Sequence, residues 1–330
     1  MLATRGQFAW DDPFKSFHQR LNARHHSTQT HDHTQFQAWL VGMTEGDGCF
    51  FIDRQHSPTG PKWTLGFKIA LETKNIRTLI YIKKQLGVGI LGPAEAGMMQ
   101  YRIRNRQHLA RVLFPIFDTI PMISQKYYDY QKVRKAFLIL EDTTLSRAQR
   151  ATAMDHLVWS THILKTSCIS PVWYSWLPAT RIAELYERHW EGLRYAEVEC
   201  FLSPAWIHGL IEAEGSFYFL QKSPGRWSHT FGMSQKDPQL LHVIRAYFHI
   251  ASKVRFRAPQ NKSHPYFLLE TSNRRNIQTL VNFCDGCFVS IKAVEFRLWQ
   301  RSFGWKPTDP RGEKVRKQLT KLHKKIKRVY

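Results

Sequence analysis

The sequence is poor in cysteine, poor in acidic residues and free of long apolar runs. Five cysteines in 330 residues make a sparse, odd-numbered set. This excludes a disulfide framework and favours a reducing compartment. No apolar segment approaches the roughly 20 residues that cross a bilayer, so we expect no membrane protein. Hydrophobic residues nevertheless make up 43% of the chain, which argues against disorder and, at this length, for about two domains.

The shortage of acidic residues gives the chain a strong positive charge. Lys and Arg number 48 against 26 Asp and Glu, a formal net charge of +22. An excess of this size favours binding to polyanions, and above all to nucleic acid. Charge alone does not separate DNA from RNA, or binding from catalysis.

Two patterns that resemble metal sites are weak. Cys284-Asp-Gly-Cys287 has no second cysteine pair at a suitable spacing, so we interpret it as two ordinary thiols rather than a zinc site. Four histidines, His25, His26, His31 and His33, stand in the polar stretch 1–34, which we interpret as a solvated N-terminal extension. This stretch lacks the apolar core of a secretory signal, and a transit peptide stays open.

The chain contains an internal duplication. The segment Trp39 to Phe51 reappears as Trp206 to Tyr218, with Trp, Gly, Glu, Gly and Phe matched and an acid shared at Asp47 and Glu214. A Ser-Pro turn follows each copy, and Ser124-Gln-Lys126 later reappears as Ser290-Ile-Lys292. The acid and the lysine lie 79 residues apart in one copy and 78 in the other. Landmarks in the same order at the same spacing indicate two homologous units, 35–142 and 203–302.

Hydrophobic periodicity predicts the order αββαββα for each unit. In the second strand, Phe67, Ile69 and Leu71 alternate with residues of the other face. The third and fourth strands include 100–104 in the first unit and 253–257 in the second. The predicted helices are 35–46, 75–86, 105–117 and 127–141 in the first unit, and 203–213, 237–248, 273–283 and 291–301 in the second.

Two further segments complete the chain. Residues 143–202 are too long and too rich in Trp for a simple linker, and we expect a partly helical connector with a helix from Arg181 to Glu197. Residues 303–330 form a basic tail, dense in Lys and Arg from 311 onward. The tail is either a helix that binds nucleic acid or a solvated extension, and the sequence leaves both open.

Small residues recur four positions apart in the duplicated motif. Gly42 and Gly46 lie on one helical face, and Gly209 and Ala213 repeat the spacing. Two such helices are expected to pack closely along a pseudo-twofold axis. Their C-terminal ends, which carry partial negative charge, then bring Asp47 and Glu214 together. Two carboxylates at that place need a cation, and hard oxygen ligands favour Mg²⁺. In so basic a protein, this arrangement points to phosphodiester hydrolysis.

The repeated motif itself resembles that of a known family. Leu40-Val-Gly-Met-Thr-Glu-Gly-Asp-Gly48 and Ile207-His-Gly-Leu-Ile-Glu-Ala-Glu-Gly215 resemble the LAGLIDADG motif. The chain is similar to single-chain, two-repeat homing endonucleases, often encoded by organellar group I introns. The resemblance implies an α+β fold of two pseudo-symmetric αββαββα units. Their antiparallel, saddle-shaped sheets bind double-stranded DNA and are packed through the motif helices.

The resemblance also implies roles for individual residues. Asp47 and Glu214, with Gly46 and Ala213 beside them, belong to the site for Mg²⁺ or another divalent cation such as Mn²⁺. Lys126 and Lys292 are the basic residues near the metal. Gln235 matches a family glutamine that contacts metal-bound water. Thr73 aligns with it in the first unit, beside Glu72, so unequal cutting of the two DNA strands is expected.

Strand parity predicts which basic residues read DNA, because side chains alternate between the two faces of a strand. The prediction covers Lys68, Arg102, Arg104, Lys253, Arg255 and Arg257. We expect a monomer in a mitochondrion or chloroplast. One alternative is a maturase that binds group I intron RNA and assists splicing, although a pure splicing factor need not keep both acids and both lysines. A DNA-binding regulator without catalysis is another, and it predicts the loss of the acids, which this sequence retains.

Overall fold

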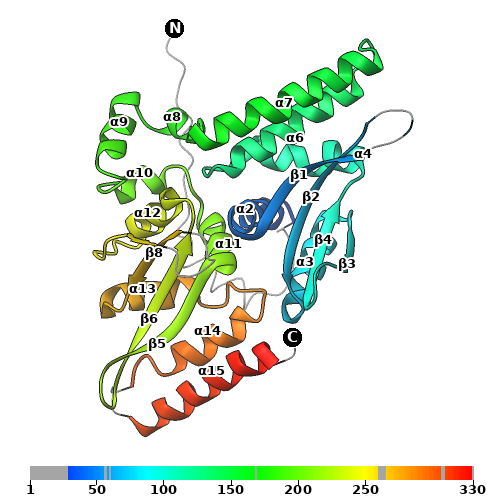
Figure 1. Ribbon diagram of the computed structural model, residues 1–330. Helices are drawn as coiled ribbons and strands as arrows, with labels where there is room; N and C mark the ends of the chain where they lie inside the picture. The colour runs from blue at the N-terminus through cyan, green and yellow to red at the C-terminus, as the bar shows by residue number, and fades with distance from the viewer. Residues whose placement is uncertain are drawn as a thin grey trace.

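The computed structural model describes residues 29–55, 58, 61–167, 169–258, 265–305 and 309–328. His25, His26 and Cys168 lie outside this part of the chain. Two halves stand on either side of a central pair of helices, α2 (Gln29–Asp47) and α11 (Pro204–Glu214), as Figure 1 shows. Among the described residues, no helix is long and apolar enough to cross a membrane.

Each half contains one antiparallel sheet of four strands. The first comprises β1 (Gly48–Gln55), β2 (Lys62–Glu72), β3 (Ile90–Pro93) and β4 (Met98–Ile103), in the order β1-β2-β4-β3. The second comprises β5 (Gly215–Ser223), β6 (Arg226–Gln235), β7 (Arg255–Arg257) and β8 (Tyr266–Thr271), in the order β5-β6-β8-β7. The same strand order in both sheets is what a duplication of one unit produces.

Helices cover one face of each sheet. In the first half they are α3 (Ile76–Leu86), which follows the 3₁₀ turn η1 (Thr73–Asn75), then α5 (Phe114–Thr119) and α6 (Lys126–Glu141). In the second half they are α12 (Pro238–Tyr247), α13 (Arg274–Cys284) and α14 (Lys292–Arg301). The alternation read from the sequence decides which face they cover, because Phe67, Ile69 and Leu71 are buried beneath them.

Local signals fix the ends of these helices. Ser203 accepts a hydrogen bond from the backbone N–H of Trp206 and so caps α11, whose first residue is Pro204. Asn273 caps α13 in the same way through the N–H of Arg275. Gly87 ends α3 with φ at +69°, a conformation that suits glycine.

The structure corrects three predicted elements. The predicted helix 105–117 is interrupted: α4 (Arg106–His108) and the π-turn η2 (Leu109–Leu113) precede α5, because Pro115 has no N–H to continue the helical ladder. The predicted helix from Arg181 to Glu197 is two helices, α9 (Ala179–Glu187) and α10 (Tyr195–Glu199). They are separated by residues with positive φ that include His189 and Trp190. The predicted strand 253–257 keeps only Arg255–Arg257, the residues that pair with β8.

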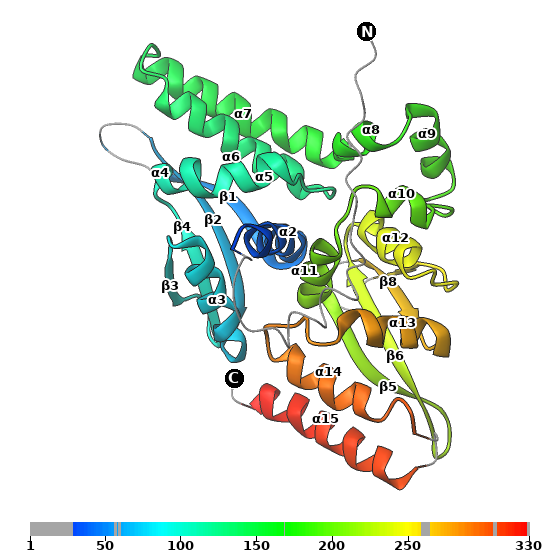
Figure 2. The ribbon, with the colours of Figure 1, turned by 180° about the vertical axis from the view of Figure 1, so that it is seen from behind.

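A further helix follows each unit and packs beside its last helix. These are α7 (Arg147–Ser167) beside α6 and α15 (Pro310–Arg328) beside α14, and both pairs stay side by side in Figures 1 and 2. The basic tail is therefore helical, and its Val315 and Leu319 are buried. We infer that the duplicated unit includes this helix.

The remaining connector docks beside the start of α6. It contains α8 (Val172–Trp176), α9 and α10. The indole N–H of Trp173 donates to the carbonyl of Ile123 at 3.0 Å, and the hydroxyl of Ser170 donates to that of Met122 at 3.0 Å. Because α10 packs against α12, the connector contacts both halves.

Candidate active site

The two motif helices cross at van der Waals contact through their small residues. A Cβ atom added to Gly42 would lie 2.0 Å from the carbonyl oxygen of Trp206, and one added to Gly209 would lie 2.0 Å from that of Trp39. A Cβ at Gly46 would meet the Cβ of Ala213 at 2.4 Å. The structure thus brings together the four small residues of the predicted interface, and no larger side chain fits between them.

This crossing sets Asp47 and Glu214 at the C-terminal ends of α2 and α11, where each helix passes into the first strand of its sheet. Both carboxylates are half-buried. Burial, followed by the charge of Glu214, raises the pKa of Asp47 to about 7. Burial also raises the pKa of Glu214. The two negative charges are therefore unfavourable at neutral pH without a cation beside them.

Lys126 and Lys292 reach the same place from the first turns of α6 and α14. The ammonium of Lys126 donates to the carbonyl of Thr44 at 2.9 Å and to that of Gly46. The ammonium of Lys292 donates to the carbonyl of Ile211 at 2.8 Å and to that of Gly215. These carbonyls lie at the motif-helix ends, where intrahelical partners run out. Both lysines lower the pKa of both acids by their charge.

The donor set fits a divalent cation shared with a ligand. Among the described residues, no group of three or more His, Cys, Asp or Glu is arranged to hold a metal ion. At the crossing, Asp47 and Glu214 offer two carboxylates, with backbone carbonyls beside them. Mg²⁺ is usually held by one or two carboxylates and completed by water and phosphate oxygens. The raised pKa of Asp47 marks the place where such a cation would be favoured.

Two further acids in the motif were missed by the sequence analysis. Glu45 accepts hydrogen bonds from the backbone N–H groups of Ile123 at 2.6 Å and Ser124 at 3.4 Å, and from the Ser124 hydroxyl. Its counterpart Glu212 binds Val289 and Ser290 in the same way. Both acids thus hold the start of the helix that carries the lysine. The sequence did contain a signal for this contact, because Glu45 and Ser124 recur as Glu212 and Ser290 at nearly the same spacing.

The strand register corrects the predicted counterpart of Gln235. Gly48 pairs with Ile69 and Gly215 with Met233, so Leu71 of the first unit occupies the position of Gln235. The predicted alignment of Thr73 with Gln235 is wrong, because Thr73 lies beyond β2 and its hydroxyl donates to the carbonyl of Gly97 at 3.0 Å. Gln235 hydrogen-bonds the Glu214 side chain, which lowers the pKa of that carboxyl. Buried Leu71 offers no such group.

In the first sheet, the predicted DNA-reading residues lie on the face away from the helices. Lys68 and Arg102 are paired across β2 and β4, while their neighbours along the strands are buried. Lys68 and Arg104 both approach the Phe51 ring, at 5.7 Å from its centroid. This face therefore carries three basic side chains, two of which lie beside one aromatic ring.

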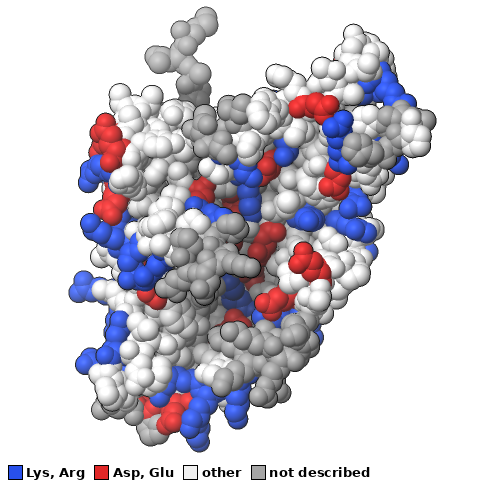
Figure 3. All heavy atoms as spheres, viewed as in Figure 1, with Lys and Arg blue, Asp and Glu red and all other residues white. Residues whose placement is uncertain are grey.

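The second sheet is less uniform. Arg255 and Arg257 are exposed on β7, and Arg255 is paired with Glu270 at 2.8 Å. Lys253 precedes the strand and lies 3.8 Å from Glu191 of the connector, so the structure does not place it on the sheet. Figure 3 shows acidic side chains between the two halves, with Lys and Arg on both sides of them.

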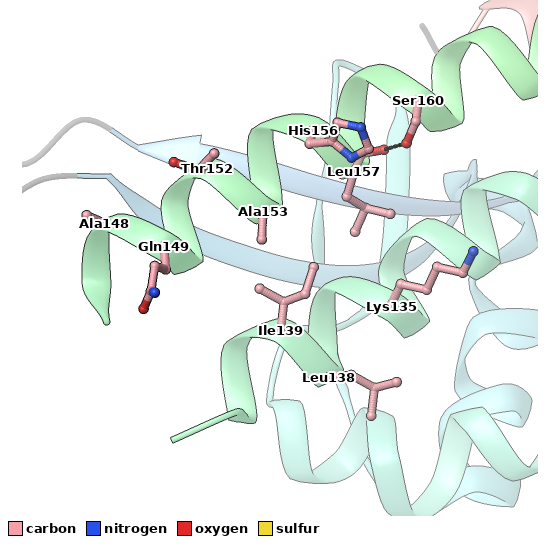
Figure 4. Close-up of a pocket in the computed structure, with 10 residues that line it drawn as sticks. All are labelled: Lys135, Leu138, Ile139, Ala148, Gln149, Thr152, Ala153, His156, Leu157 and Ser160. Atoms are coloured by element: carbon pink, nitrogen blue, oxygen red, sulfur yellow. Dashed lines mark hydrogen bonds between the residues drawn. The ribbon is translucent and has the colours of Figure 1, made fainter. Parts of the chain in front are cut away.

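A separate groove lies between α6 and α7, away from the motif helices (Figure 4). It is lined largely by apolar side chains, including Leu138, Ile139, Ala153 and Leu157. No carboxylate lines it. The candidate active site is therefore at the helix crossing and not in this groove.

Comparison with known proteins agrees with the geometry of the crossing. A sequence model described as "LAGLIDADG endonuclease" matches residues 40–137. The "Probable intron-encoded endonuclease Cox1-I1b" of Schizosaccharomyces pombe is 34% identical over 271 residues, which cover 81% of this chain and 64% of that relative. The chain belongs to the LAGLIDADG endonuclease family. It spans about two-thirds of the length of this relative.

Solved structures of LAGLIDADG proteins share the fold over most of this chain. I-GzeII, solved "in complex with DNA target", superposes with a TM-score of 0.64 at 19% identity, covering 86% of this chain and 96% of its own. I-SmaMI, solved "bound to uncleaved DNA target in the presence of Calcium ions", superposes with a TM-score of 0.61 at 17% identity, covering 86% and 97%. The predicted α+β fold with two LAGLIDADG units in one chain is confirmed.

Proposed function

We propose that this protein is a site-specific DNA endonuclease that binds a long double-stranded target along its two sheets and hydrolyses one phosphodiester in each strand. The observation that carries the proposal is the meeting of two acids and two lysines, one of each from either repeat, at the motif-helix crossing. A net charge of +22 supports a polyanionic substrate. The DNA complexes of I-GzeII and I-SmaMI support a duplex.

A divalent cation, Mg²⁺ or Mn²⁺, is part of the proposal. Asp47 and Glu214 would hold it, with the backbone at Gly46 and Ala213 beside them. When bound, the cation supplies a more acidic water and charge neutralisation at the leaving oxygen. The calcium ions named for the I-SmaMI complex support divalent binding in this fold.

The chain's own groups position the reaction. Lys126 and Lys292 place positive charge beside the acids, where the charge of a bound phosphate would accumulate. Gln235 holds the Glu214 carboxylate through its side-chain hydrogen bond. On the sheets, Lys68, Arg102, Arg104, Arg255 and Arg257 would contact bases and phosphates. Lys253 stands at the edge and would contact phosphate only.

The proposal extends to biological setting. The description of the S. pombe relative as intron-encoded supports an intron as the coding site. A group I intron of an organellar gene, in a mitochondrion or chloroplast, is the finer part of the proposal. Two complete units in one chain support a monomer as the active form. The alternative function of a maturase for intron RNA is not favoured by the relatives, and no group in the site is specific to it.

Substitution of the two acids tests the proposal. An intronless copy of the host gene, with each strand labelled separately, is incubated with the protein and Mg²⁺. We expect a double-strand cut, abolished by EDTA, and a loss of at least about 100-fold in Asp47→Asn and Glu214→Gln, since removing a ligand costs several kcal/mol of transition-state stabilisation. DNA affinity should be kept or rise, because a negative charge near phosphate is removed. Variants that cut both strands at the wild-type rate would overturn the site assignment, and variants that lose binding in step with cleavage would make these acids structural.

A further inference from the structure

The backbone just before each candidate lysine is held by side chains at three successive N–H groups. In the first unit, Ile123 and Ser124 donate to Glu45. The next N–H, that of Gln125, donates at 3.2 Å to Oδ2 of Asp237, which belongs to the second unit. Lys126 follows directly. The segment that sets this lysine is therefore shared between the two halves of the molecule.

The second unit repeats the arrangement in reverse. Val289 and Ser290 donate to Glu212. The N–H of Ile291 donates at 3.2 Å to Oδ1 of Asn75, which belongs to the first unit. Lys292 follows directly. Each unit thus receives one hydrogen bond from the other, at the residue next to its lysine.

The side chain of Asn75 makes the contact across the units and no capping hydrogen bond to its own helix. Asn75 immediately precedes α3, and asparagine is among the preferred capping residues at that position. Its side chain nevertheless makes no capping hydrogen bond to α3. Asp237 stands at the same place before α12 and does both, because its Oδ1 accepts from the N–H of Gln239 at 3.1 Å. Both residues therefore make the contact across the units, whereas only Asp237 also caps its own helix.

We propose that Asn75 and Asp237 are positioning residues that act across the unit boundary, Asn75 on Lys292 and Asp237 on Lys126. The proposal rests on the proposed function, in which both lysines assist cleavage. Each ammonium binds two carbonyls at a motif-helix end, so its place depends on where its helix begins. Small displacements of a catalytic group lower rates strongly. Removing one side chain should therefore slow the cut that depends on the lysine of the other unit.

The same contacts link each sheet to the opposite lysine. Asp237 follows β6 by two residues, and Asn75 follows β2 through the turn η1. β2 carries Lys68, one of the residues proposed to meet DNA, whereas those of the second unit, Arg255 and Arg257, lie on β7.

Cleavage measured separately for each DNA strand tests the proposed roles of Asn75 and Asp237, with the unaffected strand as the reference in each reaction. Lys292→Met and Lys126→Met identify which strand depends on each lysine. We expect Asn75→Ala to slow the Lys292-dependent strand about tenfold and Asp237→Ala to slow the Lys126-dependent strand about tenfold, as the loss of one hydrogen bond allows. The other strand should stay within about twofold. Asn75→Asp and Asp237→Asn keep an acceptor oxygen and should restore most of the rate.

Hydrogen exchange of the backbone supplies a readout that needs no cleavage. Asn75→Ala should raise exchange at 289–292 and leave 123–126 unchanged, and Asp237→Ala should do the reverse. Three results would each overturn the proposal. The first is equal slowing of both cuts, the second is slowing of the cut that depends on the lysine of the substituted unit, and the third is unchanged cleavage rates with unchanged exchange. If the wild type cuts no target, the proposed function fails, while the exchange data still decide whether these side chains hold the lysine segments.

Discussion

A single methyl group at the helix crossing should separate the two halves of the candidate active site. In Gly42→Ala the new Cβ would lie 2.0 Å from the Trp206 carbonyl oxygen and 3.0 Å from the Leu210 nitrogen. Both neighbours are backbone atoms, which cannot turn aside as a side chain can. Ordinary contact begins at about 3.4 Å, so the helices must move apart by roughly 1.4 Å at this point.

Gly42→Ala should destabilise the protein, whereas the same substitution in a helix with free space around the glycine would stabilise it. In a helix interior, alanine is favoured over glycine by about 1 kcal/mol. Overpacking of a tight contact costs about 1–3 kcal/mol, and here it falls on two backbones at once. We therefore expect Gly42→Ala to lower the free energy of unfolding by about 1–2 kcal/mol. Gly209→Ala, with its Cβ 2.0 Å from the Trp39 carbonyl oxygen, should behave alike.

The effect on cleavage should exceed the effect on stability. Asp47 lies five residues beyond Gly42 on the same helix. Separation of the helices moves this carboxylate away from Glu214, and a displacement of about 1 Å costs on the order of 100-fold in rate. DNA affinity should change little, because the basic residues lie on the sheets.

Urea unfolding and strand-labelled cleavage measure the two effects. Gly312→Ala in α15 is the matched control, since its Cβ would meet only the flexible end of Arg316 at 3.4 Å. This control should be neutral or slightly more stable, with unchanged cleavage. Wild-type stability and cleavage in Gly42→Ala would refute the argument that contact between glycines sets the distance between the acids.

Three further predictions concern the asymmetry of the site, the sheet surface and pH. Because Leu71 stands where the second unit has Gln235, the wild type should cut one strand faster and accumulate nicked duplex. Gln235→Leu should slow the faster cut, so that nicks fall equally on both strands. The same excess of nicks in one strand in this variant would contradict the prediction. Arg104→Gln should lower the slope of log affinity against log salt by about 1, whereas Lys84→Gln, exposed on α3, should leave it unchanged. Burial lowers the pKa of His229 to about 4, so its neutral form stabilises the fold above pH 6.5. This stabilisation, at most roughly 3 kcal/mol, is lost as the pH falls towards 4. The raised pKa of Asp47 acts in the opposite direction over the same range, so the His229 contribution is read from a comparison of variants. Between pH 7.5 and pH 5, the urea midpoint of His229→Gln should fall less, or rise more, than that of the wild type, and equal changes in the two proteins would contradict the assignment.

Features carried by repetition were predictable from the sequence. Two copies of Gly-x-x-x-small fixed the crossing of α2 and α11, and the matched spacing of acids and lysines predicted which side chains meet. Strand alternation in β2 gave the buried face correctly. These signals work because each depends on local geometry, a helical or strand period, that tertiary packing did not override.

What was missed depends on contacts distant in the chain or on strand register. The partner of Glu45 lies 78 residues away, and its role as an anchor for α6 follows only from the packed structure. Thr73 was misaligned because the turn η1 lengthens the link after β2, a difference that only the ladder reveals. Pro115 could be read from the sequence, but the π-turn that precedes it has no simple sequence signature.

The two sheets carry different residues at equivalent positions, and this difference affects the symmetry of the target DNA sequence. Phe51 lies beside Lys68 and Arg104 in one sheet, whereas its counterpart Tyr218 donates to Glu270, which also pairs with Arg255, in the other. A dimer of identical subunits reads an inverted repeat, because its symmetry is copied into the DNA. A covalently joined pair with unlike surfaces instead specifies two unrelated half-sites. Base preference in one half should then be open to redesign, at Arg102 and Arg104 for example, without altering what the other half reads.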